Sequence, residues 1–138
     1  NSVYLGLMDH ARLDLLLRSG AWRKIRDAGI YPVVTTQTIT YRKSLQWRQK
    51  FVLETRMAGY HGKALFVEQR FVVNGELYAR AIVKARFLKR TGGTVSIAEL
   101  NELAGEDLTQ LPLEGWIQRW ADDVALPSTR ADAPSVWE

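Results

Sequence analysis

The sequence contains no cysteine, which excludes disulfide bonds and zinc sites that depend on thiolates. Its 2 histidines lack the spacing of metal ligands, so we expect neither a bound metal nor a cofactor. No apolar run approaches the roughly 18 residues of a membrane-spanning helix, and no segment has the composition of a signal peptide. These absences predict a soluble, cytoplasmic protein without a membrane span.

Length and composition indicate a single domain. The chain has 138 residues, of which 46% are hydrophobic and 25% charged, and this is enough for one hydrophobic core. We expect the domain to cover residues 1–126. Residues 127–138, which include Pro127 and Pro134, are predicted to form a loose tail. The chain begins with Asn1 and has no initiator Met, so we also expect sequence upstream of it.

The net charge of +4 conceals an asymmetry between two parts of the chain. Residues 1–90 hold 17 Lys and Arg against 6 Asp and Glu, whereas residues 91–138 hold 2 against 9. The two parts should therefore attract each other. A basic surface also favours a partner that carries phosphates. We expect no nucleic-acid partner, because the basic strands lack interleaved exposed aromatic residues and no helix-turn-helix pattern is present.

The opening segment is typical of a helix that is apolar on nearly every side and ends near Gly20. A carboxylate, Asp9, is placed between leucines by the helical period of 100° per residue. The simpler interpretation is structural: Asp9 pairs with Arg12 at i+3, and His10 pairs with Asp14 at i+4. The alternative is a functional carboxylate that faces a cavity.

After this helix the pattern changes to strands and then returns to helices. Alternating and β-branched residues predict four strands, at residues 31–41, 50–58, 64–73 and 76–88. The turns between the later strands are predicted at Gly59 to Gly62 and at Asn74-Gly75. Ser96 with Glu99 forms a capping box for a helix through Leu103, and a second late helix is predicted at 113–126.

The last strand carries small residues on one face. Ala79, Ala81 and Ala85 recur with a period of two, which leaves room for a thick element lying across the sheet. The opening helix is the natural candidate for that element. The predicted fold class is therefore α+β, with a long central helix wrapped by a curved antiparallel sheet and extra helices at the C-terminal side.

Two segments resemble a known family. The run from Asn1 through Tyr4 and Leu5, followed by Asp9 and Ala11-Arg12, is similar to the central-helix motif of the 4-hydroxybenzoyl-CoA thioesterase-like acyl-CoA thioesterases, which have the hot-dog fold. Residues 41–45 and 69–81 also resemble segments of that family. The resemblance covers residues 1 to about 95. It implies hydrolysis of an acyl-CoA, or, in an alternative without catalysis, binding of an acyl chain or lipid.

The resemblance also implies roles for residues of the opening helix. Asp9 stands at the acidic position of the motif, and burial among leucines would make its carboxylate more basic and suited to catalysis. Backbone N–H groups near Val3 to Leu5 would bind the oxyanion, and Asn1, Tyr4 and Leu5 would contact substrate. The pattern fits Tyr4 equally well as a residue of the hydrophobic core. His10 suggests a hydratase only weakly, because the matching context of hydratases is absent.

Further expectations concern coenzyme A and assembly. Arg42, Lys43, Lys89 and Arg90 stand at strand ends and are candidates for binding the phosphates of CoA, although a solvated rim explains them equally well. Members of the family usually carry an Asp and a His-Met-Asn loop before the motif. The first strand and the catalytic loop are thus expected upstream of residue 1. By analogy we expect a homodimer or a dimer of dimers.

Overall fold

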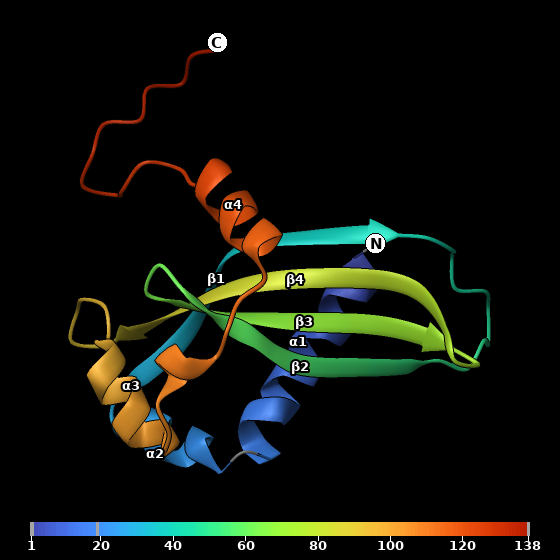
Figure 1. Cartoon of the computed structure of the whole chain (residues 1–138), viewed down its shortest axis with the longest axis horizontal. Helices are drawn as coiled ribbons and strands as arrows, with labels where there is room; N and C mark the ends of the chain where they lie inside the picture. Colours follow the sequence, from blue (N-terminus) through green and yellow to red (C-terminus); the bar gives the residue numbers. More distant parts are fainter. Residues whose placement is uncertain (1, 19, 138) are drawn as a thin grey trace.

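The computed structural model describes residues 2–18 and 20–137 and is built around one antiparallel sheet (Figure 1). Its four strands lie in the order β1-β4-β3-β2. Their bounds are Ile30–Tyr41 for β1, Val52–His61 for β2, Ala64–Val73 for β3 and Glu76–Lys89 for β4. The helices are α1 at Ser2–Arg18, α2 at Ala21–Asp27, α3 at Ile97–Ala104 and α4 at Gly115–Asp123, with a short 3-10 helix, η1, at Leu108–Gln110. This arrangement confirms the predicted α+β class and all four predicted strands.

The hairpin between β3 and β4 forms where the sequence predicts it. Asn74 and Gly75 have φ angles of 49° and 78°, the left-handed conformations that a tight hairpin turn requires. β3 pairs with β4 from Leu65 opposite Ala85 to Val73 opposite Glu76, with a register shift between Phe71 and Val72. The long β1 pairs with the other side of β4.

The helix α1 crosses one face of the sheet (Figure 1). Met8 is fully buried in a cluster with Phe71, Ala79, Ala81 and Val83. The small side chains of Ala79 and Ala81 let the helix approach the strands closely, as the alternation in β4 predicts. Thus the opening helix is the thick element that the sequence analysis expects on this face.

The helix α4 covers the opposite face of the sheet (Figure 1). Ile117 and Ala121 of α4 pack on Phe66 and Ile82, whose side chains point away from α1. The predicted helix at 113–126 is shorter than expected, since Leu113 and Pro112 lie in the connection and the helix ends at Asp123. Residues 124–137, beyond α4, are exposed, and the end of this segment extends away from the domain (Figure 1).

A third cluster closes one end of the sheet. It joins α2 to α3 and η1 through buried residues: Ile25, Ile30, Leu65, Phe87, Val95, Leu100 and Leu108. The hydroxyl of Ser96 accepts a hydrogen bond from the Glu99 N–H at 3.2 Å, which confirms the predicted helix cap. The acidic part of the chain meets the basic part here, because Lys89 Nζ lies 2.9 Å from Glu99 Oε1.

The predicted turn at Gly59 to Gly62 is wrong in part. The strand β2 continues to His61, with a register shift between Met57 and Gly59, and only Gly62 and Lys63 form the turn. Gly59 has a φ of 152°, and a Cβ placed on it would lie 2.8 Å from the Leu113 Cα. Glycine is needed here because the segment that leads to α4 crosses directly over β2.

The expectation that α1 is buried on nearly every side is also wrong. Gly6, Asp9, His10 and Asp14 are exposed, so one flank of the helix faces solvent. Among the side chains of α1 that the structure describes, Met8 is buried against the sheet, with Tyr4 and Leu7 partly buried beside it. In the part of the chain that the structure describes, no helix is long and apolar enough to cross a membrane.

Candidate functional site

The start of α1 is held against the loop that joins β1 to β2. The Tyr4 hydroxyl accepts a hydrogen bond of 3.2 Å from the Leu45 N–H. Its ring packs edge-on against Tyr41 and Phe71, with centroids 5.3 and 4.7 Å away. Tyr4 and Leu5 are half-buried, whereas Asn1 lies outside the described residues. Tyr4 therefore positions the first turn of α1 against this loop.

The carboxylate of Asp9 is fixed by a chain of contacts that leads into the core. Asp9 Oδ1 accepts a hydrogen bond from Arg12 Nη2, which confirms the structural pairing at i+3. Arg12 Nη1 donates to Gln69 Oε1 at 2.7 Å. Gln69 Nε2 in turn donates to the Met8 carbonyl at 3.0 Å and to Thr55 Oγ1 at 3.2 Å. A fully buried amide thus orients a guanidinium, which orients an exposed carboxylate.

Arg12 and Asp9, which are hydrogen-bonded to each other, lie in different electrostatic environments. Burial lowers the pKa of Arg12, and the charge and hydrogen bond of Asp9 offset part of that effect. The Asp9 side chain is 70% exposed, so the predicted burial among leucines does not occur. An exposed carboxylate in a fixed orientation is accessible to substrate and can attack a carbonyl or accept a proton from water.

Most of the first turn of α1 lies too far from Asp9 for both to act on one carbonyl group of the same chain. Because α1 begins at Ser2, the N–H groups of its first turn have no partner within the helix. Asp9 follows Ser2 by seven residues and Leu5 by four, which is roughly 10 and 6 Å along a helix axis. A nucleophile and the oxyanion donors must each lie about 3 Å from the reacting group.

The four candidate phosphate-binding residues form two separate pairs. Arg42 Nη1 and Lys43 Nζ each lie 2.8 Å from Glu76 Oε1, at the hairpin end of β4. Lys89 binds Glu99, and the Arg90 guanidinium lies 5.9 Å from the centre of the Tyr31 ring. The length of β4 separates the two pairs by roughly 40 Å along the strand. Each pair could therefore contact a different part of a ligand but not the same phosphate group.

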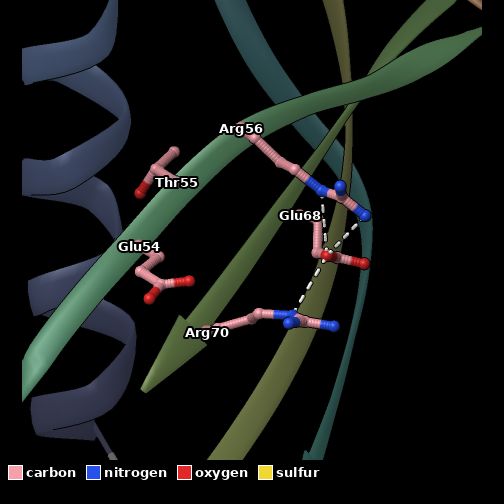
Figure 2. Close-up of a pocket in the computed structure, with 5 residues that line it drawn as sticks. All are labelled: Glu54, Thr55, Arg56, Glu68 and Arg70. Carbon is pink, nitrogen blue, oxygen red and sulfur yellow. Dashed lines mark hydrogen bonds and ion pairs between the residues drawn. The ribbon is translucent and has the colours of Figure 1, made fainter. Parts of the chain in front are cut away.

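A charged cluster that sequence analysis missed lies on the face opposite α1. Glu68 is 1% exposed. Its Oε2 accepts hydrogen bonds of 3.0 and 2.7 Å from Arg80, and its Oε1 accepts one of 3.1 Å from Arg56. Figure 2 shows Arg56 and Arg70 reaching the same carboxylate from neighbouring strands, with Arg70 Nε 3.2 Å from Oε1. These arginines lower the pKa of Glu68 although burial alone would raise it.

The sequence contains a signal for the two buried networks, one around Glu68 and the other around Gln69. Glu68 and Gln69 are consecutive polar residues in the middle of an apolar strand. Consecutive residues of a strand face opposite sides, so each of the two sides needs polar partners. A small pocket of about 140 Å³ lies beside Glu68, between Glu54, Arg56 and Arg70. Among the described residues, no group of three His, Asp or Glu could hold a metal ion.

Comparison with known proteins identifies the family. The model of the thioesterase-like superfamily matches residues 1–121. The chain belongs to the thioesterase-like superfamily. This family assignment and the curved sheet around α1 confirm the hot-dog fold that the motif at Asn1 to Arg12 implies.

Curated relatives of this thioesterase-like chain are longer than it is. Protein THEM6 of Xenopus laevis is 36% identical over 86 residues, which are 62% of this chain and 42% of the relative. Protein THEM6 of Drosophila melanogaster is 22% identical over 130 residues, which are 94% of this chain and 66% of the relative. The chain therefore spans less than two thirds of the length of either relative.

Solved structures share the fold of this thioesterase-like chain. The probable thioesterase YbaW from Escherichia coli superposes with a TM-score of 0.70 at 21% identity, covering 78% of this chain and 84% of that one. The DHNA-CoA thioesterase from Staphylococcus aureus gives a TM-score of 0.64 at 17% identity, covering 92% and 83%. At these identities the likeness shows the fold alone.

Proposed function

We propose that the chain hydrolyses the thioester of an acyl-CoA to a free acid and coenzyme A. Membership of the thioesterase-like superfamily over residues 1–121 supports this reaction class. The observation that carries the proposal is the Asp9 carboxylate, which is exposed and held in place by Arg12 on the central helix. It stands at the acidic position of the family motif.

In this proposal Asp9 accepts a proton from a water molecule whose oxygen attacks the carbonyl carbon of the thioester. The carbon–sulfur bond breaks, and the thiolate of CoA takes a proton back from the Asp9 carboxyl group. The α1 start is about 10 Å away. Arg12, directly beside Asp9, therefore supplies the positive charge that stabilises the developing oxyanion.

Binding of CoA uses the basic pairs at the strand ends. Arg42 and Lys43 are the better placed pair, because they lie at the end of the sheet where Tyr4 anchors α1. Their shared partner Glu76 is a solvent-exposed carboxylate, and a CoA phosphate would compete with it for the two cations. Lys89 and Arg90 would contact a different part of the ligand. The cytoplasmic location and the homodimer or dimer of dimers remain predictions.

The test is hydrolysis of acyl-CoAs of graded chain length, followed through the released thiol. Asp9→Asn should lower kcat by at least about a hundredfold, because it removes the base but keeps the hydrogen-bonding shape. Asp27→Asn is the control, since Asp27 is an exposed carboxylate at the end of α2 that pairs with Arg26. Unchanged turnover in Asp9→Asn would place the catalytic carboxylate elsewhere.

A second candidate function is acyl-CoA binding without catalysis. It is favoured by the separation along α1 between Asp9 and the N–H groups at the start of the helix, because those N–H groups are then poorly placed to bind the oxyanion of a carbonyl on which Asp9 acts. Tight binding of an acyl-CoA by the wild-type chain without release of thiol would establish this alternative. Turnover that depends on Asp9 would exclude it.

A further inference from the structure

The loop between β1 and β2 exposes an unusual concentration of large apolar side chains. Trp47 at its tip is 89% exposed, and Val52 at its end is 61% exposed. Tyr41 and Phe51 beside them are also exposed. The loop lies at the end of the molecule farthest from α2, α3 and the C-terminal tail (Figure 1). An exposed apolar patch of this kind marks a surface that meets a partner.

The same loop is strongly basic. From residue 28 to residue 53 the chain contains no Asp or Glu, and Arg42, Lys43, Arg48 and Lys50 give this stretch a charge of +4. Glu76 neutralises part of the charge of the first two. No carboxylate of the described residues forms an ion pair with Arg48 or Lys50, the cations on either side of Gln49 near the tip. The partner is therefore expected to be anionic as well as apolar.

The loop is ordered by its own contacts. A turn closes through the Gln49 N–H, which donates to the Gln46 carbonyl at 3.0 Å, while the Gln46 N–H donates to Gln49 Oε1 at 2.8 Å. The Leu45 N–H binds the hydroxyl of Tyr4. These hydrogen bonds fix the backbone on both sides of the tip, so Trp47 projects from a defined turn.

The tip also contains backbone strain. Arg48 has a φ of 60°, a conformation that costs an L-residue other than glycine roughly 1 kcal/mol. A glycine would avoid this cost, yet the position holds a cation directly after the exposed Trp47. Arg48 therefore follows the indole within the turn that the hydrogen bonds between Gln46 and Gln49 close.

We propose that this tip docks on the surface of an anionic lipid bilayer. Indole rings prefer the headgroup level of a membrane, where an apolar ring and a polar N–H are both accommodated. Lys and Arg beside the ring are attracted by anionic headgroups. Trp47 and Val52 enter the interface while Arg48 and Lys50 contact the headgroup phosphates. Docking here leaves the start of α1 at the membrane side, because Tyr4 holds α1 to the same loop.

The inference is independent of the proposed hydrolysis and is tested without measuring activity. The purified chain is sedimented with vesicles of phosphatidylcholine and phosphatidylserine in equal parts, and with phosphatidylcholine alone. We expect binding to the mixed vesicles that weakens as salt is added. Trp47→Ala should reduce the partition coefficient on the order of tenfold. Trp137→Ala is the matched control, because Trp137 is fully exposed in the tail and should leave binding unchanged.

A second set of variants tests the charges. Arg48→Asn and Lys50→Gln should each weaken binding by about fivefold. Asn tolerates the positive φ of residue 48, so the turn is kept. Lys63→Gln, an exposed lysine at the opposite end of β2, should have no effect.

Three kinds of result would contradict the proposal or part of it. Equal binding of wild type and Trp47→Ala, or equal losses for Trp47→Ala and Trp137→Ala, would overturn the proposal. Equal binding to both kinds of vesicle would overturn the role of the cations. If Trp47→Ala changes the molar mass from light scattering and leaves vesicle binding unchanged, the tip contacts a second copy of the chain and the proposal is wrong.

Discussion

The side-chain amide of Gln69 donates a hydrogen bond of 3.0 Å to the main-chain carbonyl of Met8, which joins the middle of β3 to the middle of α1. The oxygen of the same side-chain amide accepts a hydrogen bond of 2.7 Å from Arg12. Gln69 is fully buried, so its hydrogen bonds replace those it would make with water. One side chain therefore sets both the depth of the helix on the sheet and the position of Arg12, which holds Asp9.

Replacing Gln69 with Leu should destabilise the fold by about 3 kcal/mol, because it leaves a partly buried guanidinium and the hydroxyl of Thr55 without their partner. Urea unfolding measures the change. Gln37→Leu is the control: Gln37 is an exposed residue of β1, and its loss should change the free energy of unfolding by less than about 0.5 kcal/mol. Equal effects of the two variants would contradict the role given to Gln69.

Replacing two glycines with alanine should change the stability of the fold in opposite directions. Gly59→Ala should destabilise by about 2 kcal/mol or more, because the new Cβ would lie 2.8 Å from backbone and side-chain carbon atoms of Leu113. Gly6→Ala should stabilise by about 0.5–1 kcal/mol, since Gly6 lies inside α1 and its added Cβ meets no atom within 4 Å apart from its chain neighbours and the helix's own nearby backbone. Thermal unfolding of both variants gives the signs. A tolerated Gly59→Ala would show that the segment over β2 moves freely.

The buried Glu68 makes stability depend on pH in the acid range. Its arginine partners hold the pKa of Glu68 below the ordinary value of 4.5, so the folded state favours the ionised form. The resulting stabilisation is fully present above about pH 4.5 and is lost as pH falls through the lower pKa of the folded state. The free energy of unfolding, measured by urea titration from neutral to acid pH, should show this decline.

Glu68→Gln should destabilise by about 3 kcal/mol at neutral pH, because three arginines lose the charge that they surround. It should also flatten the decline in stability below pH 4.5. Glu54→Gln serves as the control, because Glu54 lines the same pocket but is exposed (Figure 2). The same acid decline in wild type and Glu68→Gln would assign that decline to other carboxylates.

Removing the hydroxyl of Tyr4 should loosen the loop beside α1. In Tyr4→Phe the Leu45 N–H loses its acceptor, and we expect faster hydrogen exchange at Leu45 and a stability loss of about 1 kcal/mol. Tyr31→Phe is the comparison, because it keeps the ring over which Arg90 lies. Unchanged exchange at Leu45 would mean that the hydroxyl does not order the loop.

The strands could be predicted from sequence because their signals are local. Alternating residues locate β4, and Asn74-Gly75 fixes the hairpin that sets its register. Gly59 was misassigned for a physical reason: glycine serves both in turns and where another backbone approaches closely, and only the neighbouring segment distinguishes the two.

The candidate site was predicted less well. The helical period shows which residues share a side of α1 with Asp9, but it does not show how much of the helix the sheet covers. Asp9 was therefore expected to be buried, and it is exposed. The pairing with Arg12 could be predicted because it spans three residues. The exposure of Trp47 could not, because it depends on which elements fold over the loop.

The sequence by itself determined the four strands, the opening helix, the cap at Ser96 and the family motif, since each depends on residues a few positions apart. The tertiary structure alone decided which flank of α1 is open and which groups surround Glu68 and Gln69. The partners of Gln69 on α1 lie 57 and 61 residues away along the chain. Contacts of that separation form only when the sheet brings distant segments together, and no local pattern encodes them.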